Sequence, residues 1–318
     1  MDHLTAPRGL IVDLVTPLRA NGEIDGRGLG RLLDRVLPHV QAVFIASPYA
    51  GEGVNLSVSQ REDLFDKTLV VVRGRTPLFV WVTGGTQDDT GQILLLLLKK
   101  VETRKYSGPL FWVDTPLYYH SNRGLTLHYQ NLCTIAKQSW MLHNDPELIR
   151  QVGRTFKRKN IRTAILKNLA GIQEIRGLIF LGPLERTGHY QKAVRKKHDF
   201  RIYDGQESHF LMYPSMSGVV SSGANLAPKA WRKITDASLN MPDGQGDYPD
   251  RLHQLLKTGV YLQKLAEICR SFPSPTIKSV LSKMEIIESP MSIMQSEVEE
   301  EKVRALIKEM NDYGDYPQ

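Results

Sequence analysis

The sequence predicts an eight-stranded (β/α)8 barrel, a TIM barrel, with a C-terminal helical appendage. Short apolar segments rich in β-branched and aromatic residues alternate with amphipathic helical segments over the first two-thirds of the chain. The expected strands lie at residues 10–15, 42–46, 77–82, 109–113, 140–143, 163–166, 200–203 and 218–221. Strands that are apolar on both faces and separated by helices indicate a parallel sheet, and this number of them matches a closed barrel.

Helical patterns connect these strands at residues 27–37, 60–72, 88–103, 125–138 and 147–157. A doubly wound open sheet is the competing architecture, because it has the same alternation of strands and helices. The first turn between strand and helix reads TPLRANGE and lacks the G-x-G-x-x-G pattern of dinucleotide-binding sheets. The barrel is therefore favoured.

Strand signals stop at about residue 229, and helical patterns follow at 230–239, 251–272, 276–284 and 296–310. We therefore expect two regions. Residues 1–228 form the barrel that carries the active site, and residues 229–318 form a helical region packed on it.

The composition is that of a soluble globular protein, with 41% hydrophobic and 24% charged residues in 318. The longest apolar run, residues 93–98, is far shorter than the roughly 20 residues needed to cross a bilayer. The segment MDHLTAPRG has no signal-peptide layout. Cys133 and Cys269 belong to no CxxC pattern, so we expect reduced, buried thiols in a cytoplasmic protein.

The formal charge of +7 arises from 41 Lys and Arg against 34 Asp and Glu. Basic residues gather in two clusters, Arg154, Lys157, Arg158, Lys159 and Arg162, then Arg195, Lys196 and Lys197. Aromatic residues do not alternate with them and no nucleic-acid-binding motif accompanies them, so solvated helix faces are expected and no nucleic-acid partner. The nine histidines are scattered without metal-ligand spacing, which argues against a metal site.

Barrels place their active sites at the carboxyl ends of the strands. Lys167 follows the apolar residues of the expected sixth strand, where a lysine either extends to solvent or becomes a nucleophilic amine in a desolvated pocket. His143 follows the fifth strand and has an intrinsic pKa suited to proton transfer near neutrality. His120 follows the fourth strand with two tyrosines.

The order of several short motifs carries more information than any one of them. They are GLIVDLVTP at 9–17, SPYAGEGVNLSVSQRE at 47–62, TPLYY at 115–119, HNDP at 143–146, LKNLAG at 166–171, SGVVSSGANLAP at 217–228 and PSPTIK at 273–278. In this order and spacing, the chain resembles the family of dihydrodipicolinate synthase and N-acetylneuraminate lyase, whose members are Schiff-base-forming aldolases and lyases.

The resemblance implies a specific chemistry. Lys167 would form an imine with pyruvate or a related 2-oxo acid, so no separate cofactor or metal is needed. The backbone amides of Ala50 and Gly51 would hold the substrate carboxylate, and Val220 would contact the pyruvyl unit. Tyr118 or Tyr119 would enter a proton relay, typically from a neighbouring subunit, in a homo-oligomer that is a dimer or tetramer.

The chain departs from the family pattern at several positions. His143 replaces the tyrosine of Y-N-x-P, and Tyr49 and Ala50 replace the paired hydroxyl residues of G-T-T-G-E. Asp13 stands on the first strand, where it either forms an ion pair with Lys167 or acts as the missing base. The segment after Pro146 lacks the arginine that holds the second substrate's carboxylate, which argues against a true dihydrodipicolinate synthase.

Two functions from different classes follow. The first is a divergent lyase or aldolase that acts on a 2-oxo acid through Lys167, with His143 and a tyrosine moving protons. The alternative is a noncatalytic family member that binds a metabolite or serves as an assembly partner. Imine formation with pyruvate would distinguish them.

Overall fold

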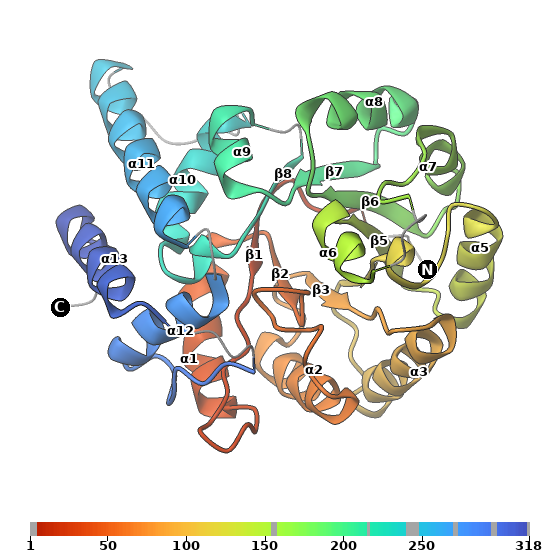
Figure 1. The fold of residues 1–318 in the computed structure, drawn as a ribbon, viewed down its shortest axis with the longest axis horizontal. Helices are drawn as coiled ribbons and strands as arrows, with labels where there is room; N and C mark the ends of the chain where they lie inside the picture. The colour runs from red at the N-terminus through yellow and green to blue at the C-terminus, as the bar shows by residue number, and fades with distance from the viewer. Residues whose placement is uncertain are drawn as a thin grey trace.

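Eight parallel strands close into a barrel in chain order in the computed structural model (Figure 1). The structure describes residues 5–153, 158–214, 217–239, 248–269, 273–293 and 298–316. The strands are β1 Gly9–Asp13, β2 Ala42–Ile45, β3 Leu78–Trp81, β4 Leu110–Asp114, β5 Ser139–Asn144, β6 Ile175–Phe180, β7 Arg201–Asp204 and β8 Gly218–Ser221. The predicted (β/α)8 barrel is confirmed.

The sixth strand is not where the sequence pattern placed it. Residues 163–166, expected as a strand, begin the helix α7 Thr163–Leu169, and β6 follows at Ile175–Phe180. Two residues obscured β6 in the sequence. Arg176 is a charged residue within the strand, and it forms an ion pair with Asp199 at 2.6 Å. Gly177 has no side chain, and a Cβ at this position would lie only 2.4 Å from the carbonyl oxygen of Arg201. The prediction of a strand at 163–166 was wrong.

Helices cover the outside of the barrel (Figure 1). They are α1 Gly26–Val36, α2 Val58–Val72, α3 Gln87–Thr103, α5 Leu125–Ile135, α7 and α8 Leu184–Val194, with the 3-10 turns η1 Leu37–His39 and η2 Gly223–Asn225. The short helices α4 Pro116–Tyr119, α6 Pro146–Gln151 and α9 Glu207–Met212 directly follow the carboxyl ends of β4, β5 and β7. The helix expected at 147–157 ends at Gln151, and Arg154 and Lys157 of the first basic cluster lie outside the described residues. None of the described helices is long and apolar enough to cross a membrane.

Large side chains fill the interior of the barrel. The cluster consists of Ala6, Ile11, Ala42, Phe44, Phe79, Trp81, Phe111, Val113, Met141, Ile179, Tyr203 and Val220. Such packing makes the interior a solid core rather than a channel. A ligand of the barrel must therefore bind above this core, at the carboxyl ends of the strands.

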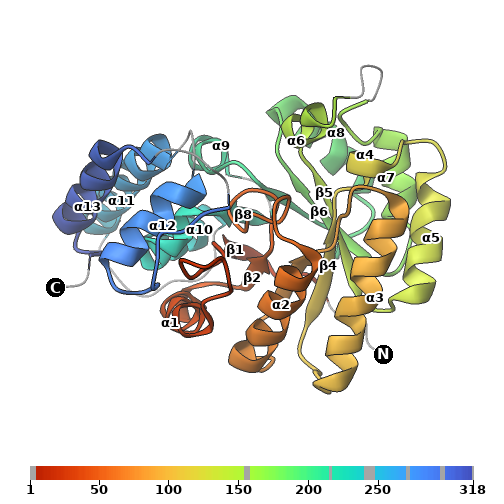
Figure 2. The same ribbon diagram turned by 60° about the horizontal axis from the view of Figure 1, so that its bottom comes forward.

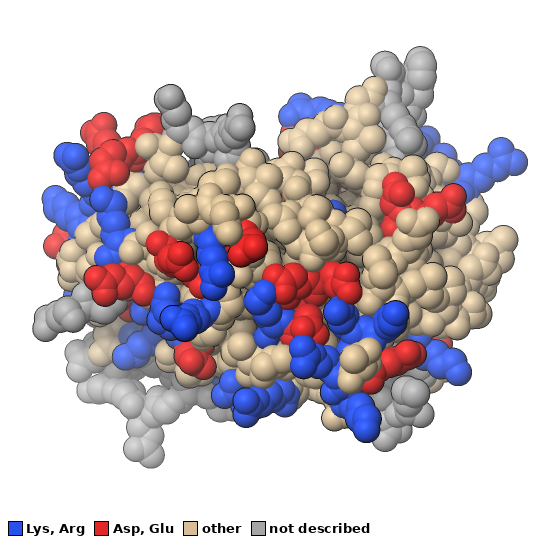
Figure 3. All heavy atoms as spheres, turned by 90° about the horizontal axis from the view of Figure 1, so that it is seen from below, with Lys and Arg blue, Asp and Glu red and all other residues tan. Residues whose placement is uncertain are grey.

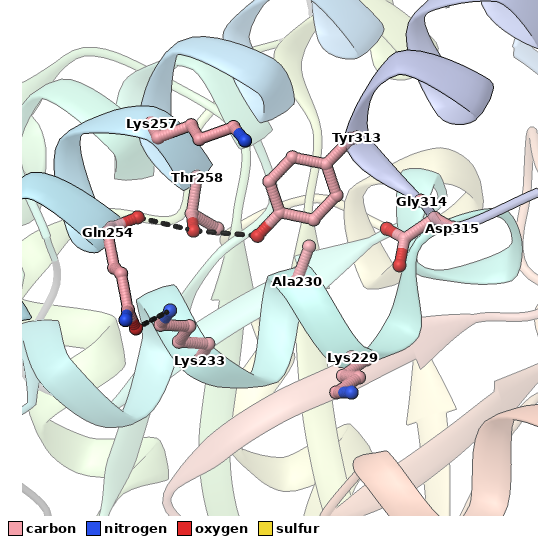
Figure 4. Close-up of a pocket in the computed structure, with 9 residues that line it drawn as sticks. All are labelled: Lys229, Ala230, Lys233, Gln254, Lys257, Thr258, Tyr313, Gly314 and Asp315. Atoms are coloured by element: carbon pink, nitrogen blue, oxygen red, sulfur yellow. Dashed lines mark hydrogen bonds between the residues drawn. The ribbon is translucent and has the colours of Figure 1, made fainter.

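After β8 the described chain is helical and packs on one side of the barrel (Figures 1 and 2). The helices are α10 Pro228–Ser238, α11 Tyr248–Cys269, α12 Pro273–Lys283 and α13 Glu300–Tyr313. The hydroxyls of Thr258 and Tyr313 join α11 to α13 at 2.7 Å, and Lys233 donates to Gln254 at 2.9 Å to join α10 to α11 (Figure 4).

A buried ion pair connects this helical region to the barrel. Glu52, in the loop after β2, pairs with Lys278 of α12, and both side chains are fully buried. Lys278 also donates to the carbonyl oxygen of Met291 at 2.9 Å, and Glu52 accepts from the amide of Ile293 at 3.0 Å and from the hydroxyl of Ser292. The pair is thus enclosed by further hydrogen bonds, which is the condition for burying two charges.

Charged side chains on the outer surface alternate in sign, as Figure 3 shows for one face. Helix faces carry ion pairs such as Arg104 with Asp66 and Lys100 with Glu62. Pairs of this kind keep helix faces solvated and contribute little to stability.

We expect Lys278→Met to lower the free energy of unfolding by about 3 to 5 kcal/mol, because Glu52 would stay buried without its partner. Urea denaturation measures the loss. Lys283→Met on the same helix is the control, because it breaks a half-exposed pair with Glu300 and should change stability far less. Equal losses in the two variants would contradict a special role for the buried pair.

Candidate functional site

Lys167 does not lie at the mouth of the barrel. It is exposed on the outer helix α7, so the prediction that it ends the sixth strand was wrong. The interior position near the end of β6 is instead Ile179, which lies in register between His143 of β5 and Tyr203 of β7. Within the described residues, Lys278 is the fully buried lysine, and it is paired with Glu52.

Asp13 stands at the end of β1 in a hydrogen-bond chain with the loop after β2. The amide of Gly51 donates to Ser47 Oγ at 2.8 Å, and Ser47 forms a hydrogen bond with the Asp13 carboxyl. Asp13 Oδ1 is buried without a hydrogen-bond partner among the described residues. Burial raises the pKa of Asp13 to about 7, opposed by the Ser47 hydrogen bond and aided by the nearby charge of Glu207.

The sequence left two roles open for Asp13, an ion pair with Lys167 or the missing base. An ion pair with Lys167 is excluded, since Lys167 lies on the outside of the barrel. A carboxyl group with a pKa near 7 exchanges its proton at neutral pH. Asp13 is therefore equipped to donate a hydrogen bond or to move a proton.

His143 is buried at the end of β5 and belongs to a chain of three side chains. The indole Nε1 of Trp81 donates to Thr115 Oγ1 at 2.9 Å, and Thr115 Oγ1 lies 2.9 Å from His143 Nδ1. Because an indole N–H can only donate, Thr115 Oγ1 accepts from it and can donate its own proton to Nδ1, and in that tautomer the ring proton resides on Nε2. Burial lowers the pKa of His143 to about 3, so the ring is a neutral hydrogen-bond donor.

The two adjacent tyrosines of α4 have different surroundings. The hydroxyl of Tyr119 donates to Asp114 Oδ2 and lies 2.8 Å from His128 Nε2, and the hydroxyl of Tyr129 donates to the same carboxylate oxygen. Tyr119 is thus committed to a buried network beside the barrel. Tyr118 is half-buried, and its entry into a proton relay stays a prediction.

Tyr49 is half-buried and forms a hydrogen bond with Asp145. Burial and the charge of Asp145 raise the pKa of the Tyr49 phenol, so it stays protonated. Asp145 also accepts from the amides of Glu147 and Leu148 at 2.9 and 3.2 Å, which caps α6.

One of the two amides expected to hold the substrate carboxylate, that of Gly51, donates to Ser47 Oγ at 2.8 Å within the protein. The Gly51 carbonyl accepts from Thr16 Oγ1 at 2.7 Å. Ala50 is buried in the core, and Val220 belongs to the interior cluster, where it pairs in register with Ile11.

Sequence reasoning missed Ser47, Thr115 and Glu207. Glu207 follows β7 and accepts from the amide of Gly223 at 2.6 Å and from Ser221 Oγ at 2.7 Å, and burial raises its pKa. All three are polar residues that come shortly after a strand, which is the signal that could have found them. Glu207 and Ser222 also line a cavity of about 610 Å³ between α9 and α11.

The model of the dihydrodipicolinate synthetase family matches residues 6–309. The chain belongs to this family. A family relative, the 4-hydroxy-tetrahydrodipicolinate synthase of Thermotoga neapolitana, is 28% identical over 94% of this chain and 96% of its own length. That of Shewanella sp. (strain W3-18-1) is 27% identical over 73% of this chain and 74% of its own.

Solved structures of this family share the fold. A monomeric dihydrodipicolinate synthase variant superposes with a TM-score of 0.77 at 22% identity, covering 99% of both chains. The dihydrodipicolinate synthase of Thermotoga maritima gives 0.76 at 21% identity, covering 97% of this chain and 99% of that one.

We expect Asp13→Asn to stabilise the protein increasingly as the pH rises. A folded-state pKa raised to about 7 means that the wild type holds its proton more tightly when folded, so its stability is complete below about pH 4, falls between about pH 4 and 7 and is level above that. Asparagine cannot ionise, so the variant should gain up to about 4 kcal/mol over wild type above pH 8, at about 1.4 kcal/mol per pKa unit.

Asp66→Asn is the contrasting variant for denaturant titrations between pH 4 and 9. The hydrogen bond from Arg104 lowers the pKa of Asp66, so its contribution is present above about pH 4 and is lost on acidification. This variant should be less stable than wild type at neutral pH. The same pH slope in both variants would contradict the assignment of Asp13.

Proposed function

We propose that this family member binds a small 2-oxo acid, or a related hydroxy acid, at the mouth of the barrel without forming an imine. One observation carries the proposal: the interior position near the end of β6 is Ile179, where an imine-forming amine would be needed. Because Lys167 lies exposed on an outer helix, we favour over a lyase acting through it the alternative of a noncatalytic family member that binds a metabolite.

The polar groups of the mouth fit such a ligand. Nε2–H of His143 and the protonated carboxyl of Asp13 are both hydrogen-bond donors, which suits the oxygens of a carboxylate or ketone. Phe44, Trp81 and Ile179 form an apolar floor that suits a short carbon chain.

Borohydride trapping with pyruvate, followed by peptide mass mapping, tests the absence of an imine. We expect no reduced adduct on the wild-type protein, whereas Ile179→Lys should form one. The new amine would lie between His143 and Tyr203, where burial lowers a lysine pKa and frees the nucleophile. Ile179→Met preserves the size of the side chain and serves as the control. A wild-type adduct at any lysine would overturn the proposal.

Binding itself should depend on pH. Since ionised Asp13 would repel a carboxylate, we expect the affinity for pyruvate to fall about tenfold per pH unit above 7. Calorimetric titrations between pH 6 and 9 measure this fall, and Asp13→Asn should bind with an affinity that does not change over the range. A wild-type affinity that is also constant would remove Asp13 from the binding site.

A second function, proton transfer to carbon, is favoured by the pKa of Asp13. In the fraction of complexes in which Asp13 is ionised, its carboxylate would remove a proton from the methyl group of the bound 2-oxo acid while His143 Nε2–H donates to the enolate oxygen. Nuclear magnetic resonance in D2O would detect deuterium entering the methyl group of pyruvate. Deuterium exchange in the wild type that is absent in Asp13→Asn would establish this activity in addition to binding.

The proposal extends to assembly and location. We expect a homo-oligomer, a dimer or tetramer, on the basis of family membership, although one structural neighbour is described as a monomeric variant. Both cysteines, Cys133 and Cys269, are free and buried, which suits the cytoplasm. Light scattering of the purified chain tests the oligomeric state.

A further inference from the structure

A second cavity, of about 520 Å³, lies at the opposite end of the barrel from the candidate site. Its lining includes Arg8, which precedes β1, Arg201, which begins β7, and Ser217, which precedes β8. Arg195 and Lys197 enter it from the segment after α8. Because parallel strands all begin at one end of a barrel, these residues mark its amino-terminal end.

The cavity is lined by four cationic side chains and His198, with no aspartate or glutamate among its lining residues. None of these four cations has a carboxylate within 4.0 Å in the part of the chain that the structure describes. Asp199, the acidic residue between His198 and Arg201, forms an ion pair with Arg176 at 2.6 Å. Other surface cations have acidic partners, as in the pair of Lys264 with Glu309. Among the described residues, the lining of this cavity therefore holds positive charge without a carboxylate partner.

Backbone carbonyls hold two of the guanidinium groups in place. Arg201 donates from Nε to Ala6 at 3.3 Å and from Nη1 to His198 at 3.4 Å. Arg8 donates from Nη2 to Leu239 at 3.5 Å. Each guanidinium has five N–H donors, so both keep donors for a ligand while their positions are restrained.

We propose that this cavity binds a phosphorylated small molecule. Guanidinium and ammonium groups pair with phosphate oxygens through charge-assisted hydrogen bonds, and several cations favour a ligand with more than one negative charge. The volume lies in the range of small-molecule sites, and Val194 and Phe200 give an apolar wall for an organic group. A nucleic acid is less suited, because these cations line a cavity rather than a stripe along the surface.

Titration calorimetry with inorganic pyrophosphate at constant ionic strength tests the proposal on the full chain. We expect saturable binding of one pyrophosphate per chain and a rise in melting temperature with its concentration. Lys197→Gln should weaken binding roughly fivefold or more, because it removes a cation of the cavity. Lys196→Gln is the matched control, since Lys196 belongs to the same basic cluster but does not line the cavity, and it should weaken binding less than about twofold.

Asp13→Asn should bind pyrophosphate as the wild type does, which separates this site from the mouth of the barrel. Absence of saturable binding would overturn the proposal. Equal weakening in Lys196→Gln and Lys197→Gln would also overturn it, since that result describes general attraction to a basic surface. Tighter binding of a DNA duplex than of pyrophosphate, with equal loss in the two variants, would replace it with a nucleic-acid surface.

Discussion

The buried ion pair between Glu52 and Lys278 is the contact on which the geometry of the mouth depends. Glu52 belongs to the loop after β2 that also carries Ser47, the hydrogen-bond partner of Asp13. The loop is tightly folded, since a Cβ at Gly53 would lie 1.9 Å from the carbonyl oxygen of Ala46. Separating two charges that have no access to water costs several kcal/mol, on the order of 3 to 5, so the pair holds this loop against α12. The C-terminal helices thereby position a residue of the candidate site without contributing one to it.

The packed interior explains why Asp13 and His143 at the mouth favour their neutral forms. Aromatic side chains such as Phe44 and Trp81 lie beneath the polar groups and leave them little water. Burial then raises the pKa of Asp13 and lowers that of His143, and both shifts favour the neutral form. Asp13 and His143 therefore offer hydrogen-bond donors rather than charges. Such donors would suit a polar ligand, and the site contains no strong nucleophile among the described residues.

The sequence predicted the barrel and seven of its strands because their apolar residues form continuous runs, as in β3 and β4. It failed at β6, where Arg176 and Gly177 interrupt the apolar run for reasons that only the neighbouring strands reveal. That single error moved Lys167 from an outer helix into the expected site. His143 and Asp13 were found at strand ends, whereas the role of Ser47 required a contact between two loops that no local pattern encodes.

The two ends of the barrel differ in charge, and the fold keeps them apart. A strand of five residues is about 17 Å long, so the two ends of the barrel lie well apart. Between the ends lies the apolar interior cluster, which contains no ionisable group other than the phenol of Tyr203. The four cations around Arg201 are not among the groups that shift the pKa of Asp13, which are its own burial, Ser47 and Glu207. The two proposed ligands would therefore occupy separate ends of the barrel.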